Sequence, residues 1–369
     1  MTHTVDGGVG MHQAAPPLPR PRARMPVPAR LGALSAATAS LLALALVLGS
    51  TPIPLVEVGH ALFGTGPVSA QTHTIVWEVR LPRAVTALAA GSALGLAGLQ
   101  MQTLLRNPLA EPYILGVSSG ASLGVAIVVL ASGSGSAAFT AGLAGGGRAG
   151  TVLAAAMGAA SVLALMLLLA RWTQSVATLL IIGVMVGSGV SALVSVLVAS
   201  ADPRQVQQFV MWGMGSFSGP TWPDLAWLLP ILGVGSLASL ALVKPLNAML
   251  LGDTYARTMG VNVRVVRWLV LFVASGLAGT VTAFCGPVAF LGLAIPHLTR
   301  IALTTADHRI LMPACVVMGG AVALLCGTVA SLPGTAAVLP LNSVTALVGA
   351  PIVITVLLRG RANTHGGAL

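Results

Sequence analysis

The side chains of this 369-residue chain that could carry protons, metal ions or phosphate are few. Its acidic residues are Asp6, Glu57, Glu78, Glu111, Asp202, Asp224, Asp253 and Asp307. None falls in the middle of a long apolar run, where an ion-driven carrier keeps the ionisable groups that bind its coupling ion. His297 is the best candidate for a proton relay, although a structural histidine is the commoner explanation. The sequence therefore shows no clear ion-coupling site.

The chain also lacks the residues of a nucleotide-hydrolysing enzyme. Its one lysine, Lys244, lies between Val243 and Pro245, whereas a phosphate-binding loop ends in Gly-Lys followed by Ser or Thr. We therefore expect no catalytic residue and no cofactor bound by this chain. The cysteines Cys285, Cys315 and Cys326 lie far apart in apolar runs, which predicts small buried side chains and no metal site.

Composition places the chain in a lipid bilayer. Charged residues make up 7% of it and hydrophobic residues 56%, and the mean hydropathy is +0.94. A soluble domain has about 25% charged residues, so a soluble enzyme is excluded. The net charge of +10 comes from arginines spread singly between apolar runs, a placement typical of membrane topology and not of nucleic-acid binding.

Apolar runs of helical length recur ten times along the chain. They cover about residues 31–49, 84–104, 114–131, 151–170, 176–199, 224–243, 265–285, 288–304, 311–331 and 341–358. Runs of this length predict an all-α polytopic membrane protein with ten transmembrane helices. We expect a disordered basic tail at 1–30, a ten-helix domain at 31–361 and a second tail at 362–369. Glycines spaced four apart, as at Gly91 and Gly95 or Gly120 and Gly124, predict closely packed helices.

The positive charges give the orientation of this domain. If residues 1–30 are cytoplasmic, 14 of the 18 Lys and Arg residues lie in inside segments. Positive residues favour the cytoplasmic side, so both termini are expected in the cytoplasm. A ten-helix protein without an ion-coupling or nucleotide site is either a passive pore or the membrane half of a machine driven by another subunit.

One inside loop, residues 244–264, favours the second alternative. Its central part, from Leu250 to Val261, predicts a short amphipathic helix with Asp253 in the first turn and Gly260 at the end. Such a helix is too short to cross a membrane. It is either an interfacial connector, held to lipid headgroups by Arg257, Arg264 and Arg267, or a lever that docks into a cytoplasmic motor.

Several blocks of this sequence, in order from about residue 31 to 361, resemble the FecCD family. These are permeases of ATP-binding-cassette (ABC) importers that take up cobalamin, haem and ferric siderophores. The matching blocks are Arg80-Leu81-Pro82-Arg83, Arg106 to Pro112, Leu115 to Gly120, Gly252 to Val261, Phe290 to His297, Asp307-His308-Arg309 and Thr345 to Pro351. The resemblance implies a multi-pass protein of the inner membrane of a prokaryotic cell. It also implies a homodimer with two cytoplasmic ATPases, which bind the ATP and magnesium, and an extracytoplasmic substrate-binding protein.

The resemblance also implies roles for particular residues. The segment that would couple to the ATPase contains Leu251, Gly252, Asp253, Ala256, Arg257, Gly260 and Val261. Arg80 and Arg83 match arginines that meet carboxylates of the binding protein, a role that suits a guanidinium on the outside face; contact with lipid phosphates is the alternative. The cytoplasmic gate and path would be formed by Asn107, Pro108, Leu109, Gly116, Ser118, Ser119, Gly120 and Ser175.

The sequence departs from the family before its last helix. Family members commonly carry an acidic residue, an arginine and a Glu-Leu-Pro motif there, whereas this chain has Gly327 to Ser331 and then Val338 to Asn342. The missing charges leave the cargo open. Ferric siderophore is the expected cargo because it is the commonest one in the family, with haem or cobalamin as alternatives. A secondary transporter or channel is the competing class.

Overall fold

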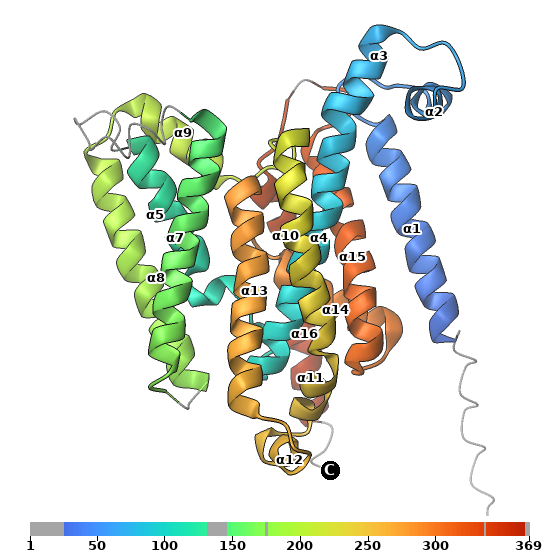
Figure 1. The fold of residues 1–369 in the computed structure, drawn as a ribbon. Helices are drawn as coiled ribbons and strands as arrows, with labels where there is room; N and C mark the ends of the chain where they lie inside the picture. Colours follow the sequence, from blue (N-terminus) through green and yellow to red (C-terminus); the bar gives the residue numbers. More distant parts are fainter. Residues whose placement is uncertain (1–25, 131–145, 174–175, 336, 366–369) are drawn as a thin grey trace, which may run out of the picture.

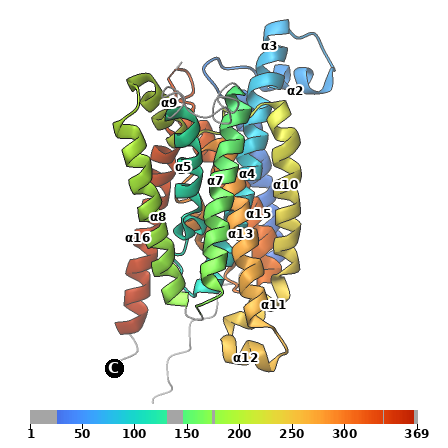
Figure 2. The same cartoon turned by 60° about the vertical axis from the view of Figure 1, so that its left-hand side comes forward.

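A computed structural model describes residues 26–130, 146–173, 176–335 and 337–365 of the chain. Within these ranges the regular structure is entirely helical (Figure 1). The long helices run roughly side by side and form one bundle, with short helices at both of its ends (Figures 1 and 2). The fold class expected from the hydropathy pattern is confirmed.

Seven described helices are long and apolar enough to cross a membrane. They are α1 (Val27–Val47), α4 (Leu81–Leu105), α7 (Gly147–Ala170), α8 (Val176–Ala199), α10 (Trp222–Ala241), α13 (Val263–Cys285) and α15 (His308–Ala330). Three shorter apolar helices, α5 (Val117–Leu130), α14 (Leu291–Leu303) and the 341–355 part of α16 (Leu341–His365), correspond to the other three runs. Each of the ten apolar runs of the sequence is therefore a helix.

Shorter elements connect these helices. They are α2 (Leu55–Phe63), α3 (Ala70–Thr74), the π-helical turn η1 (Ile75–Arg80), the 3-10 turn η2 (Pro112–Leu115), α9 (Pro203–Gly213), α11 (Val243–Leu250) and α12 (Asp253–Thr258). α3 and η1 continue directly into α4. The figures show α2, α3 and α9 at one end of the bundle, and α12 at the other, together with the first turn of α1 and the last turns of α16 (Figures 1 and 2). We call the α12 end the inner end.

The first helix begins earlier than the hydropathy predicts. Pro26 stands at its N-cap and Val27 is its first residue, so the last residues of the predicted tail are helical. A proline is well suited to a helix start because its missing N–H is not needed there. Arg30 lies in this first turn and donates to Leu303 O at 3.2 Å and to Thr304 Oγ1 at 2.9 Å, at the end of α14. Residues 1–25 lie outside the described ranges. At the other terminus α16 extends to His365, beyond the predicted boundary at 361.

Helix α4 is the centre of the bundle. It packs against α10, α13, α14 and α15, and most of its residues are buried. The packing is close because glycines face each other: a methyl group added at Gly91 would overlap the backbone of Gly319 in α15, and one at Gly98 would overlap the backbone of Gly292 in α14. Gly120 and Gly124 of α5 meet α7 in the same way. The close packing expected from the glycine spacing is confirmed.

Candidate coupling and gating site

The inside loop folds into two helices at the inner end of the bundle. α11 follows α10 after one residue, and α12 begins at Asp253. The turn between them requires Gly252, whose φ of 109° is unfavourable for other residues, and Gly260, at φ 82°, ends the segment. The single helix predicted from Leu250 to Val261 is therefore shorter, and a separate helix precedes it. We call residues 243–261, which contain the stretch predicted to couple to the ATPase, the coupling segment.

α12 presents apolar side chains to its surroundings. Ala256 is completely buried under the helix, whereas Tyr255, Met259 and Leu251 are each more than half exposed. Arg257 is exposed beside them and lines an open groove of about 400 Å³. Exposed apolar residues gathered on a short element at the end of a molecule are typical of a protein contact surface.

Asp253 ties α12 to the bundle through two arginines. Its Oδ1 pairs with the guanidinium of Arg106, and its Oδ2 lies 3.3 Å from Nη2 of Arg267. Arg106 is the residue that ends α4, in a left-handed conformation with φ 46°. The next residue is Asn107, the first of the predicted gate. The structure therefore joins two sites that the sequence placed apart, the coupling segment and the gate loop.

The loop predicted to form the gate is a tight turn. Asn107 Oδ1 accepts the backbone N–H of Leu109 at 2.9 Å, and Asn107 O accepts that of Ala110 at 3.1 Å. Pro108 is exposed at the tip of the turn. The proline and the asparagine together explain why α4 cannot continue here.

The remaining predicted path residues lie where α5 begins. Gly116 ends η2 with φ 76°, and Ser118 and Ser119 are partly buried in the first turn of α5. Gly120 packs against the backbone of Gly158 in α7. Ser175, the remaining residue predicted for the gate, lies outside the described ranges.

The connection between α4 and α5 turns back into the bundle. Pro112 packs against Gly292, which lies beside Gly98 of α4. Gly98 is seven residues, or about 10 Å, from the inner end of α4. Glu111 is therefore not in a surface loop, as its position in the sequence indicated. Its Oε1 accepts the backbone N–H of Phe290 at 3.1 Å, at the start of α14, where a carboxylate is favourable.

The structure also corrects the interpretation of Arg80. This side chain is only 6% exposed. Its guanidinium donates to Leu46 O and Val47 O at 2.7 Å each, and to Thr51 O. These carbonyls belong to the end of α1 and the turn after it, where helix carbonyls have no partner within the helix. Arg80 is therefore not an exposed docking residue in this conformation: it holds α1 to the start of α4.

We predict that Arg80→Ala destabilises the protein by about 2 kcal/mol, because three backbone carbonyls lose a charged donor. Arg204→Ala is the matched control, since Arg204 is an exposed arginine at the same end of the molecule. Thermal unfolding in detergent measures the difference. A melting temperature of Arg80→Ala equal to that of Arg204→Ala would contradict the structural role.

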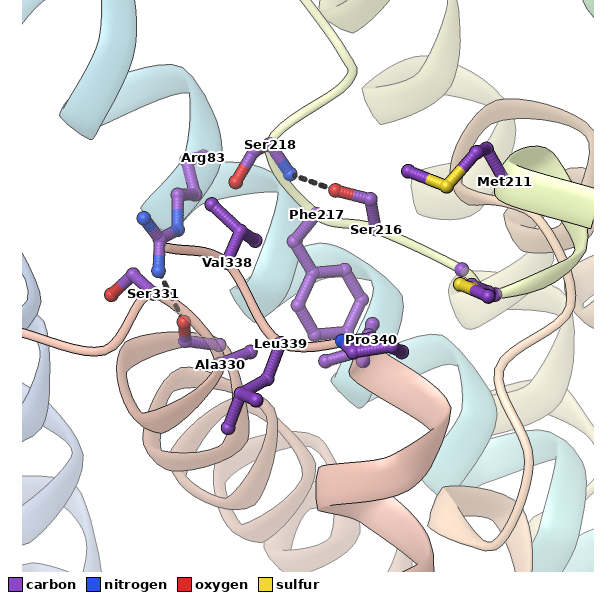
Figure 3. A pocket seen from close by; sticks show the side chains of 14 residues that line it. Arg83, Met211, Ser216, Phe217, Ser218, Ala330, Ser331, Val338, Leu339 and Pro340 are labelled. Carbon is purple, nitrogen blue, oxygen red and sulfur yellow. Dashed lines mark hydrogen bonds between the residues drawn. The ribbon is translucent and has the colours of Figure 1, made fainter. Parts of the chain in front are cut away.

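Arg83, the second predicted docking residue, is only partly buried. It lines a cavity of about 300 Å³ at the outer end and donates to Gly327 O. Figure 3 shows Arg83 on one side of this cavity, with Phe217 and Ser331 nearby and Leu339 on the segment before α16. The stretches that lack the family's charges, around Ser331 and Leu339, therefore form the wall of a largely apolar cavity.

Sequence reasoning missed the partners of the coupling segment. Arg267 was interpreted as a possible headgroup contact, and Arg106 was assigned no role. The Asp307-His308-Arg309 block was noted only as a match. In the structure Asp307 Oδ1 accepts from Asn247 Nδ2 at 2.6 Å and from Arg309 N at 2.9 Å, and these bonds lower the pKa of the Asp307 carboxyl from its ordinary value. One sequence signal could have indicated these contacts: Arg106, Arg267 and Asp307 each lie near a predicted helix end.

Among the described residues, no group of three His, Cys, Asp or Glu side chains lies close enough to hold a metal ion. Cys285, Cys315 and Cys326 are buried and form no disulfide, which confirms the interpretation of the cysteines as small core residues.

This bundle of long apolar helices, with a short helix protruding at its inner end and tied to the loop after the central helix, has the architecture of a multi-pass membrane protein. The chain belongs to the FecCD transport family, whose model matches residues 37–359. It is therefore a permease of the ABC importer class.

Individual relatives agree with this assignment. The chain is 37% identical over 300 residues to a vitamin B12 import system permease protein of Klebsiella pneumoniae, covering 80% of this chain and 86% of the relative. It is 36% identical to the protein of the same name from Citrobacter koseri, covering 79% and 85%. A solved structure described as an inward-facing metal-chelate type ABC transporter matches with a TM-score of 0.76 at 30% identity, covering 90% of this chain and 99% of the other.

Proposed function

We propose that this chain is the membrane-spanning subunit of an ATP-driven importer that moves a metal chelate into the cytoplasm across the inner membrane of a bacterium. In the working transporter it forms a homodimer, two cytoplasmic ATPases bind its inner face, and a substrate-binding protein docks at the outer end. The chain itself hydrolyses no ATP, and the nucleotide and magnesium belong to the ATPase.

The Asp253 ion pairs are the observation that supports this proposal most strongly. They connect a protruding apolar helix to the residue before the gate loop. An ATPase that binds Tyr255 and Met259 and moves when it binds nucleotide would therefore displace Arg106 and the end of α4. Through this link, the ATP-bound form of the ATPase would contact the permease more favourably in one state of the path than in the other. A difference of this kind is what shifts the populations of the open and closed states.

The cargo is proposed from similarity. Relatives that are 35–37% identical carry the name of vitamin B12 permeases, and the similar solved structure is described as a metal-chelate transporter. We therefore propose cobalamin and ferric siderophore, the cargo expected from the sequence, as equal candidates.

Reconstitution of the complete transporter in liposomes tests the function. The chain, its ATPase and its binding protein are reconstituted so that the liposome lumen corresponds to the cytoplasm and contains the ATP. Uptake of radiolabelled cobalamin is then compared with uptake of labelled ferric siderophore. We expect ATP-dependent uptake of one of these two cargoes. Uptake of neither would contradict the proposed cargo. Uptake that is the same with ATP and with a non-hydrolysable analogue would contradict the ATP-driven function.

Glu111 distinguishes this function from an ion-driven carrier, because it is an acid inside the bundle. We predict that Glu111→Gln retains uptake within about twofold of the unaltered protein, since the amide oxygen can still accept the N–H of Phe290. Glu111→Ala should lose about 1 kcal/mol of stability through the missing helix cap. Uptake and thermal unfolding are measured for both variants. Loss of uptake in Glu111→Gln, together with uptake by the unaltered chain on a proton gradient without ATP, would support the ion-driven class instead.

A further inference from the structure

A buried histidine joins three helices at the inner end. His308, the first residue of α15, is 1% exposed. Its Nδ1 lies 2.8 Å from Asn247 Oδ1 in α11, and its Nε2 lies 2.8 Å from Thr103 Oγ1 in α4. One imidazole ring therefore connects the coupling segment to the central helix.

The amide of Asn247 is held in one orientation by its other bonds. Its Nδ2 donates to Asp307 Oδ1 at 2.6 Å, and its Oδ1 accepts the backbone N–H of His308 at 2.9 Å. With the oxygen facing the ring, Nδ1 of His308 is the donor of that contact. Nε2 is then an acceptor, and the Thr103 hydroxyl donates to it. The alternative acceptor of this hydroxyl is Leu99 O, 2.9 Å away in its own helix. Asn247 is therefore bound both to the N-cap of α15 and, through His308, to α4.

This link lies next to the Asp253 ion pairs. Thr103 and Arg106 are three residues apart in sequence at the end of α4, so their side chains lie on neighbouring positions of one helix face. The coupling segment thus reaches the same turn of α4 at two points, from α11 through Asn247 and His308 and from α12 through Asp253. Two attachment points oppose rotation of the segment about either one of them.

We propose that Asn247, His308 and Thr103 are positioning residues that pass the displacement of the coupling segment to the inner end of α4 and so to the gate loop. This inference rests on the proposed function. Breaking this link leaves the Asp253 ion pair as the remaining attachment of the coupling segment to α4. A displacement of the segment then moves α4 less, so less cargo crosses for each ATP hydrolysed.

The test measures cargo molecules moved per ATP hydrolysed by the complete transporter in liposomes. Thr103→Val removes the hydroxyl with almost no change in volume, and Thr103→Ser retains it. Asn247→Leu removes the amide at the other end of the link. Asn262→Ala is the matched control, because Asn262 is an asparagine of the same inner face whose side chain caps its own helix at Val265 N.

We expect the ratio of transport to hydrolysis to fall about fivefold in Thr103→Val and in Asn247→Leu, as for a coupling of about 1 kcal/mol between contacting residues. Thr103→Ser and Asn262→Ala should keep the ratio of the unaltered protein. The double variant Thr103→Val with Asn247→Leu should be no worse than either single variant, because both break one link. A merely structural role would lower the amount of assembled transporter and leave the ratio unchanged.

The outcomes separate the two proposals. Uptake by the unaltered transporter with an unchanged ratio in Thr103→Val would overturn the positioning role alone. An equal loss in Thr103→Val and Thr103→Ser would also overturn it, since the hydroxyl would not be the group that matters. No ATP-driven uptake by the unaltered transporter would overturn the proposed function. If Asn247→Leu does not assemble, the comparison of Thr103→Val with Thr103→Ser still tests the positioning role.

Discussion

Replacing Asp253 with alanine should reduce ATP-driven uptake by about tenfold while ATP hydrolysis by the partner continues. The two ion pairs of Asp253 are partly exposed, so each contributes about 1 kcal/mol or less to stability. Together they are sufficient to shift an equilibrium between two states of the path about tenfold. Uptake and hydrolysis are measured on the same liposomes, and we expect the melting temperature to change little.

Thr254→Ala is the control for this variant, because Thr254 is the exposed neighbour of Asp253 in α12. Arg106→Gln should resemble Asp253→Ala, and the double variant should add little to either single change. Because exposed ion pairs are screened by salt, the coupling of the unaltered protein should also weaken at high ionic strength. Full uptake in both Asp253→Ala and Arg106→Gln would refute the connection between α12 and the gate loop.

The second large effect concerns the core of the bundle. Gly98→Ala should prevent assembly or lower stability by about 3 kcal/mol, because the added methyl group overlaps the backbone of Gly292 and two packed helices must separate. Backbone atoms cannot rotate away as a side chain can. The yield of monodisperse protein and its melting temperature in detergent measure the effect.

Gly276→Ala provides the matched comparison. Gly276 is also a glycine inside a spanning helix, α13, but nothing lies within 4 Å of the position of its added carbon. Alanine favours helices more than glycine does, so this variant should be as stable as the unaltered protein or slightly more stable. Equal behaviour of Gly98→Ala and Gly276→Ala would show that α4 and α14 do not approach as closely as the structure has them.

The positions of the helices could be predicted from the sequence because they depend on local hydropathy. Ten apolar runs gave ten helices, and glycine spacing predicted close packing of helices, although the pairs α4 with α15 and α5 with α7 are known only from the structure. A short helix with Asp253 in its first turn and Gly260 at its end was also predicted, although the structure shortens it and places a separate helix before it. These features depend on residues close together in the sequence and on the membrane environment, which the composition of the chain indicates.

The positions of the charged side chains could not be predicted in the same way. Arg80 was assigned to an exposed surface because an arginine outside the membrane is expected to meet water or a partner, yet it binds carbonyls more than 28 residues away in sequence. Glu111 was assigned to a loop, although its partner is the backbone of Phe290. Both contacts depend on how distant segments pack, which hydropathy does not report.

Contact between α12 and the partner ATPase is the most direct test of the account. Tyr255→Cys places a thiol on the exposed face of α12, and Arg204→Cys places one at the opposite end of the molecule. In the assembled transporter, a thiol-reactive photo-cross-linker should join Tyr255→Cys to the ATPase, with a yield that changes between ATP-bound and nucleotide-free states, and should not join Arg204→Cys. Absence of any cross-link from Tyr255→Cys in transporters that still take up cargo with ATP would contradict the claim that ATP hydrolysis acts through this helix.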